Sequence, residues 1–115
     1  MEKPEIEFTP VTDVGWTMVD VRCPELTERV LASDESSEVA TRILRFEPGT
    51  NTSALGTMVH PFWEEVYILE GSLHDLVLDQ TFRAGSYACR PPGMRHGPWT
   101  SKDGCVTFEV RYPNP

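Results

Sequence analysis

The most patterned stretch of this chain is MVHPFWEEVYILEG, residues 58–71, in which a histidine and a glutamate precede an apolar run and a closing glycine. Side chains of a β-strand alternate between two faces, so Glu64 shares its face with Val66 and Ile68. A carboxylate that faces a core is costly unless it meets a cation or a hydrogen-bond network. The stretch therefore predicts a strand with an inward-facing carboxylate, and a bound divalent metal ion would remove the cost of placing it there.

The rest of the sequence predicts one small all-β domain. The chain has 115 residues, and its 8 glycines and 10 prolines separate short apolar runs that show no helical repeat. The expected strands are Gly15–Val21, Thr41–Phe46, Val66–Leu69, Leu73–Leu78, Tyr87–Arg90 and Val106–Tyr112. Leu31–Val39 is acidic and rich in serine, which indicates a solvated loop. Met1–Pro10 is predicted to be a loosely held arm or an edge strand exchanged with a partner.

Charge and composition argue against several classes of partner. Lysine and arginine number 10 against 18 aspartates and glutamates, and the net charge of −8 repels phosphate backbones and anionic lipids. We expect neither nucleic acid nor a membrane as a partner. The start MEKPEIEF lacks the features of a signal peptide, so a cytoplasmic location is expected. Cys23, Cys89 and Cys105 form no CxxC pair and are predicted to be reduced residues in or near the core.

A second patterned stretch is GSYACRPPGMRH, residues 85–96. Together the two stretches resemble the two motifs of the cupin superfamily, HxHxxxExxxxxxG and GxxxxxPxGxxHxxxN. The matching positions are His60, Glu64, Gly71, Gly85, Pro91, Gly93 and His96. Two positions depart from the motifs, because Met58 stands where the first has its leading histidine and Thr100 where the second often has asparagine.

Residues outside the two motifs extend the resemblance to the ChrR-like cupin subfamily. The segment RILRFEPGT, residues 42–50, looks like the strand and turn that lead into the first motif. The subfamily includes the cupin half of ChrR-type anti-sigma factors and small enzymes similar to acetylacetone-cleaving dioxygenases. The resemblance implies a single cupin domain over residues 1–115 with its core at roughly 40–112. The implied fold is a double-stranded β-helix, a small jelly-roll-like barrel.

The resemblance also implies one divalent metal bound by His60, Glu64 and His96. Two imidazoles and one carboxylate on one side of an ion leave positions open for substrate or O₂, and this set suits Fe(II). Fe(II) is therefore the metal expected in an oxygenase, with Zn, Mn or Ni as alternatives. Met58 leaves three outcomes open: water takes the vacant position, the thioether binds the ion weakly, or the site binds no metal.

Strand alternation turns two further charged residues inward. Arg90 shares a face with Ala88, and Asp75 shares a face with Leu73 and Val77. The simplest prediction is an ion pair between Arg90 and Asp75, with the forked guanidinium bound to the carboxylate. The alternative is a catalytic role, in which Arg90 offers a substrate a counter-charge beside the metal and Asp75 lines the pocket.

Aromatic residues flank the expected ligands. Phe62 and Trp63 follow His60 directly, and Trp99 lies three residues after His96. Rings in such places can line the mouth of a pocket and exclude water from a metal, and they can equally belong to the core or to an interface. His74 has the opposite alternation from the inward residues, so it is predicted to lie outside the barrel.

These features predict a metal-dependent cupin that acts on a small oxygenated organic molecule. Dioxygenase-type cleavage of a C–C bond is the reaction that the resemblance implies. The alternatives are lyase or isomerase chemistry at the same site and a non-catalytic module that senses a metal or metabolite. A short chain with an exposed sheet edge can protect that edge by pairing with a second copy, so a homodimer is expected.

Overall fold

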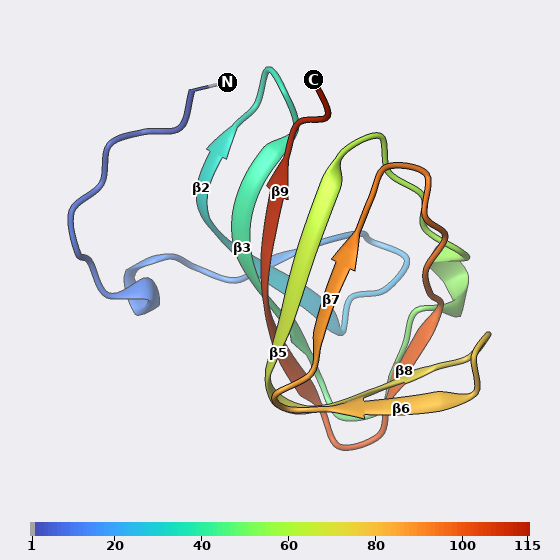
Figure 1. Ribbon diagram of the computed structural model, residues 1–115. Helices are drawn as coiled ribbons and strands as arrows, with labels where there is room; N and C mark the ends of the chain where they lie inside the picture. Colours follow the sequence, from blue (N-terminus) through green and yellow to red (C-terminus); the bar gives the residue numbers. More distant parts are fainter. Residues whose placement is uncertain (1) are drawn as a thin grey trace.

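One long strand organises the molecule. In the computed structural model, which describes residues 2–115, β5 (Trp63–Asp75) runs through both walls of a curled antiparallel sheet (Figure 1). The first half of β5 pairs with β7 (Tyr87–Arg90) and β9 (Cys105–Tyr112). Its second half pairs with β6 (Gln80–Arg83) and β8 (Trp99–Ser101). A single strand therefore joins the two walls of a half-barrel.

The remaining strands extend the two walls. The larger wall continues from β9 through β3 (Val39–Phe46) and β2 (Leu26–Asp34) to β1 (Thr17–Met18), and the smaller wall ends at β4 (Thr50–Asn51). Two 3-10 turns, η1 (Val11–Asp13) and η2 (Ser53–Leu55), are the helical segments of the described residues. The nine-stranded antiparallel sheet confirms the predicted all-β fold. No helix within residues 2–115 is long and apolar enough to cross a membrane.

β5 bends sharply where it passes from one wall to the other. Its register against β9 shifts between Ile68 and Glu70. Gly71 follows in a left-handed conformation with φ 74°, and a Cβ added there would lie 2.0 Å from the carbonyl oxygen of Gly104. Glycine permits both this conformation and the close approach of the two backbones. The glycine that closes the first motif is therefore the corner of the barrel.

The bulge also changes which residues of β5 face inward. Glu64, Val66 and Ile68 are buried before it, and Leu73 and Asp75 are buried after it. These five positions were predicted to face inward, and the prediction is confirmed. The core packs at the bend between the two walls. It consists of Cys23, Leu26, Leu44, Phe46, Ile68, Leu73 and Cys105.

Two predictions about the larger wall are wrong. The segment Leu31–Val39 contains the end of β2 and the first residue of β3, and only residues 35–38 form a turn. The side chains of β2 after Leu26 are all half-buried, so LTERVLASD carries no alternation that could identify the strand. Cys89 is exposed on β7, unlike the buried Cys23 and Cys105, because it occupies an outward position of that strand.

Other expected segments differ in extent. The strand predicted for residues 15–21 is reduced to Thr17–Met18, and the two predicted between residues 66 and 78 are one strand that ends at Asp75. Val77 is 70% exposed in the turn that follows, so its predicted inward orientation is wrong. Within the predicted arm, residues 2–10 form no strand and Phe8 is fully exposed, while Met1 lies outside the described residues.

Candidate functional site

Three segments bring the two histidines and the glutamate together. Glu64 points inward from β5, and His60 lies in the loop that leads into this strand. His96 is fixed opposite Met58 by two backbone hydrogen bonds: the Met58 N–H donates to the His96 carbonyl at 2.7 Å, and the His96 N–H donates to the Met58 carbonyl at 3.1 Å. The Gly93 N–H also donates to the His60 carbonyl at 2.9 Å. The proline- and glycine-rich turn thus holds both histidine segments side by side.

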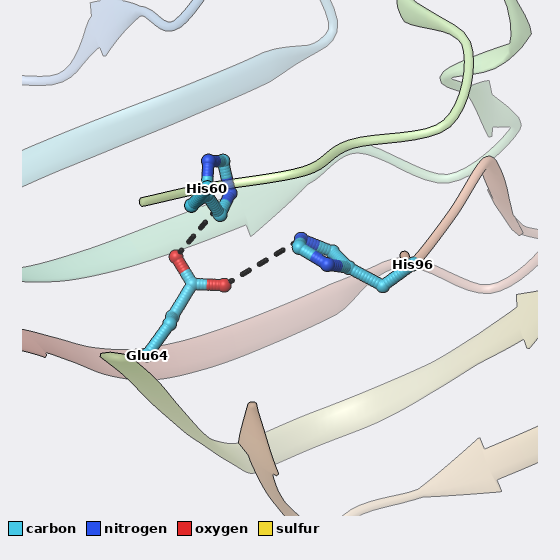
Figure 2. Close-up of side chains that lie close together, drawn as sticks. All are labelled: His60, Glu64 and His96. Atoms are coloured by element: carbon cyan, nitrogen blue, oxygen red, sulfur yellow. Dashed lines mark ion pairs between the residues drawn. The ribbon is translucent and has the colours of Figure 1, made fainter. Parts of the chain in front are cut away.

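The side chains of these three residues converge on one point, as Figure 2 shows. The Nε2 atom of His60 lies 4.0 Å from Oε2 of Glu64, and the Nε2 atom of His96 lies 3.8 Å from Oε1. One ligand atom from each residue falls within 4.8 Å of the other two. The carboxylate is 3% exposed, so the group is largely shielded from bulk water. This His-Glu-His triad could hold a metal ion.

The protonation states of the triad suit metal binding. Burial lowers the pKa of both histidines, so each ring is neutral near pH 7 and offers a free lone pair. The Nδ1–H of His96 donates to the Met94 carbonyl at 3.3 Å, which leaves Nε2 as the unprotonated nitrogen that faces Glu64. Burial raises the pKa of Glu64, but the charges of Arg111, Arg42 and Arg90 outweigh it and hold that pKa below its ordinary value.

Glu64 is contacted by three guanidinium groups. Arg111 donates from Nε to Oε2 at 2.8 Å, Arg90 donates from Nη1 to Oε1 at 3.2 Å, and Nη2 of Arg42 lies 3.8 Å from Oε2. Each carboxylate oxygen has two lone pairs, so one on Oε1 stays free for an ion. The donor set therefore fits a divalent cation, although the cation would share its carboxylate with the arginines.

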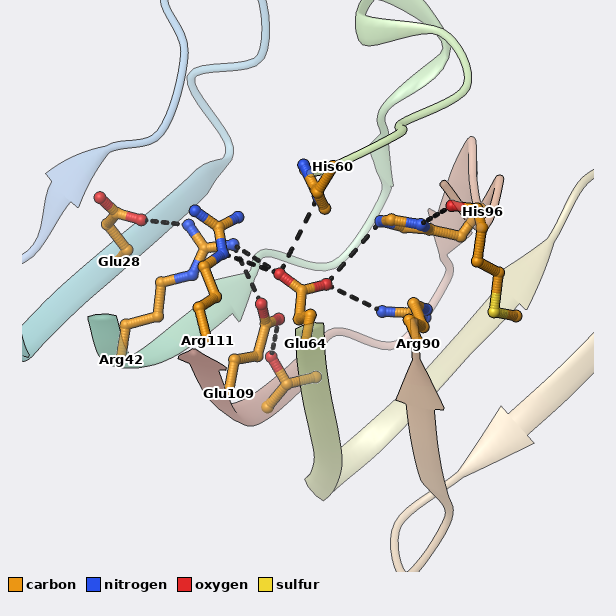
Figure 3. A network of polar contacts seen from close by, with 10 residues as sticks. Glu28, Arg42, His60, Glu64, Arg90, His96, Glu109 and Arg111 are labelled. Carbon is orange, nitrogen blue, oxygen red and sulfur yellow. Dashed lines mark hydrogen bonds and ion pairs between the residues drawn. The ribbon is translucent and has the colours of Figure 1, made fainter. Parts of the chain in front are cut away.

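Arg42 belongs to a wider network of buried charges (Figure 3). It donates to Glu28 at 2.6 Å and to Glu109 at 3.0 Å, and Glu109 also accepts from the Thr107 hydroxyl at 2.9 Å. Sequence reasoning missed Arg42 and Arg111. Arg42 lies two residues before the buried Leu44 in β3 and so shares its face, a signal that would have placed it inward. Arg111 follows the buried Cys105, Thr107 and Glu109 at alternate positions of β9, and this inward row contains no run of apolar residues that would mark it.

A comparison with known protein families identifies the family of this chain. A family model for the ChrR Cupin-like domain matches residues 6–114. The chain belongs to this cupin family. No curated protein matches its sequence. The resemblance that the two motifs carry is thereby confirmed.

Solved structures of other cupins share this fold. An RmlC-like cupin from Shewanella frigidimarina is 20% identical with a TM-score of 0.74, and the match covers 99% of this chain and 96% of that one. An acetylacetone dioxygenase from Acinetobacter johnsonii is 16% identical with a TM-score of 0.72, and the match covers 93% and 74% of the two chains. The polyketide cyclase RemF from Streptomyces resistomycificus is 20% identical with a TM-score of 0.71, covering 93% and 79%. At these identities the likeness shows the double-stranded β-helix fold alone.

A cavity of about 490 Å³ opens beside the triad of this cupin. The lining is mainly apolar and comes from both halves of β5, from β6 and β7, and from the segment that carries His96. The apolar residues include Val66, Ile68, Leu73, Phe82 and Trp99. His96 and Arg90 also line the cavity, so they connect it with the candidate metal position. A small organic molecule can therefore lie next to the triad.

The predicted ion pair between Arg90 and Asp75 is wrong. Asp75 accepts hydrogen bonds from the backbone N–H groups of Val77 and Leu78, each at 2.9 Å, and so fixes the turn after β5. Arg90 is opposite Glu64 in the β5–β7 ladder and pairs with that residue. Both residues were predicted to face inward. The turn after β5 provides the partners of Asp75, and β5 itself provides the partner of Arg90, Glu64.

Two of the four expected pocket residues line the cavity. These two are Asp75 and Trp99. Phe62 is buried instead, and its ring stacks on that of His60 with the ring centres 4.7 Å apart. The ring of Trp63 stacks on that of Tyr112, with the centres 6.2 Å apart. Phe62 precedes the inward Glu64 by two residues and so keeps the inward side, whereas Trp63 takes the opposite one.

The structure also shows the contacts of His74 and of Met58, the methionine in the first motif. His74 contacts Thr81 and Asp79 through its two ring nitrogens, at 2.9 and 3.1 Å, away from the triad. Met58 is half-buried and bonded to His96 through its backbone, while its thioether remains a candidate ligand by prediction.

Proposed function

We propose that this cupin binds one divalent metal ion through His60, Glu64 and His96 and acts on a small oxygenated organic molecule in the adjacent cavity. The observation that carries the proposal is the convergence of two neutral imidazoles and an ionised carboxylate beside a mainly apolar cavity of about 490 Å³. Two histidines and one carboxylate suit Fe(II) and leave coordination positions for substrate and O₂. We take dioxygenase-type C–C cleavage as the reaction to test first, since structural neighbours include acetylacetone dioxygenases.

The residues of this chain would have separate roles in the reaction. His60, Glu64 and His96 would hold the metal, which supplies Lewis-acid and redox chemistry when bound. The apolar cavity wall would exclude water from the substrate and orient its apolar part. The Met94 carbonyl would hold His96 in the tautomer that binds through Nε2.

Metal binding is the first test of this proposal. Protein treated with EDTA is titrated anaerobically with Fe(II), Mn(II), Ni(II) and Zn(II), and the bound metal is counted by elemental analysis. We expect one ion per chain for at least one metal and its loss in His60→Ala and His96→Ala. The matched control is His74→Ala, which removes an imidazole that lies away from the triad. Binding weaker than micromolar for every metal would overturn the proposal.

Oxygen uptake then separates the reaction classes. The metal-loaded protein is supplied with diketones and aromatic ketones in an oxygen electrode cell. Uptake that depends on both metal and ketone supports a dioxygenase, whereas turnover of the ketone without uptake supports lyase or isomerase chemistry.

A sensor module is the second candidate. Two features favour it: both oxygens of Glu64 already accept hydrogen bonds from arginines, and Met58 replaces a motif histidine. Metal or metabolite binding without turnover of any ketone supports this alternative.

A further inference from the structure

Of the two arginines that line the cavity beside the triad, Arg90 is the less exposed. Arg90 lines the cavity, and its side chain is 12% exposed. The one acid of the wall, Asp75, is bonded to two backbone N–H groups, and the second cation of the wall, Arg95, is exposed. The charge of Arg90 is thus held where a ligand in the cavity would meet it.

Arg90 shares the carboxylate of Glu64 with Arg111 and Arg42. Its one hydrogen bond with described residues runs from Nη1 to Glu64, and Arg111 makes the shorter contact with the same carboxylate. Arg42, by contrast, has both Glu28 and Glu109 as partners. A guanidinium carries five N–H donors, so most of those on Arg90 remain available. An anion in the cavity would accept hydrogen bonds from these free donors.

The same side chain lies against the apolar wall. The guanidinium carbon of Arg90 is 5.4 Å from the centre of the Trp99 ring, and Trp99 itself lines the cavity with Val66, Ile68 and Leu73. A ligand whose anionic group reaches Arg90 would therefore place its body against apolar side chains. A volume of about 490 Å³ is ample for a molecule of one or two rings.

We propose that Arg90 forms an anion subsite, and that the substrate is a small carboxylate with an apolar body. The proposal rests on the function proposed above, because it names the substrate class of the same site. A dication that shared the Glu64 carboxylate would compete with Arg90 for it, so the guanidinium would keep N–H donors free for the anion.

Matched pairs of charged and neutral ligands test this subsite. Calorimetry compares benzoate with benzamide and 3-phenylpropionate with 3-phenylpropionamide, first in EDTA and then with saturating Zn(II). We expect each carboxylate to bind at least about tenfold tighter than its amide, a preference typical of a charge-assisted hydrogen bond. Arg90→Met removes this preference, and Arg90→Lys restores part of it. Arg83→Met, which makes the same change of charge on the exposed β6, leaves the preference intact.

A second readout separates a binding role from a structural one. Removing Arg90 takes a competing cation away from Glu64, so Arg90→Met is expected to bind Zn(II) tighter while it binds benzoate weaker. A variant that merely loosened the fold would bind both more weakly. Equal affinity for benzoate and benzamide in the unaltered protein would overturn the inference, and so would a preference that survives in Arg90→Met. Because the preference is measured in EDTA as well, its outcome is independent of whether metal binds.

Discussion

Met58 is the residue that most directly limits the strength of the proposed metal site. It lies opposite His96 in an antiparallel bridge, and side chains at opposite positions of such a pair share one face. An imidazole at position 58 would therefore stand beside that of His96. We expect Met58→His to bind Zn(II) or Ni(II) about tenfold tighter or more, since a strong donor replaces water or a thioether. Met18→His, at an exposed position of β1, serves as the control, and unchanged affinity would place residue 58 away from the ion.

Cys105 gives the fold a predictable sensitivity to alkali. Burial raises the pKa of its thiol from 9.0 to about 12. The folded state keeps this proton more firmly than the unfolded chain does, so the contribution to stability is full below about pH 9 and is lost as the pH rises through about 12. Urea unfolding at about pH 8 and about pH 10.5 measures the loss. Cys105→Val should flatten this part of the pH dependence, and Cys89→Ser, at an exposed thiol, should leave it unchanged.

At the scale of elements, the bend of β5 depends on Gly71. A Cβ at this position would lie 2.0 Å from the Gly104 carbonyl oxygen, and the backbone there is left-handed. Gly71→Ala should therefore lower the free energy of unfolding in urea by about 3 kcal/mol or more, as both an overlap and a conformational penalty arise.

Gly85 provides the matched control for that substitution. Its φ of 91° is also left-handed, but no atom lies within 4 Å of an added Cβ. Gly85→Ala should cost only the conformational penalty of about 1–2 kcal/mol. Equal losses in the two variants would show that the approach of β5 to Gly104 contributes nothing to stability.

The two faces of the larger wall show that an apolar row is not always the inward one. In β9 the apolar Val106, Phe108 and Val110 alternate with Thr107 and Glu109. Alternation alone makes the apolar set the inward one, yet Thr107 and Glu109 are the buried pair because they join the charge network around Arg42. An element whose inner face is polar and whose outer face is apolar reverses the usual rule.

At the scale of the whole molecule, an apolar row that crosses the outward face of the larger wall is the reason to expect a second copy as a partner. Ile43, Phe108, Tyr67 and Tyr87 are paired in turn across β3, β9, β5 and β7, on the face of the wall opposite Glu64. Tyr67 and Tyr87 are 44% and 59% exposed. Exposed apolar surface on a small domain marks an interaction site, and homo-oligomers are most often symmetric dimers.

We therefore expect the protein to be a homodimer that packs through this face. Light scattering with size-exclusion chromatography should give twice the chain mass of 13.0 kDa. Tyr67→Glu should shift the population to monomer, since it buries a charge in the interface. Val21→Glu, at a position that is 78% exposed outside this row, should not. A monomer in the unaltered protein would refute the expectation.

The fold family and the three candidate ligands could be predicted from the sequence alone. Both follow from the resemblance to the two cupin motifs, and the motif positions meet local constraints: the alternation that turns Glu64 inward, the left-handed glycine that bends β5, and the turn before His96. The structure brings the three candidate ligands within 4.8 Å of one another, as the motifs imply.

Only the tertiary structure decided which charges meet Glu64. Arg42, Arg90 and Arg111 come from β3, β7 and β9, and no strand's own pattern states which strand it will pair with or at what register. For the same reason, Arg90 was expected beside Asp75, although the β5–β7 register sets it opposite Glu64. The side of a strand on which a residue lies is a local property, whereas its partner across the barrel depends on how the whole chain closes.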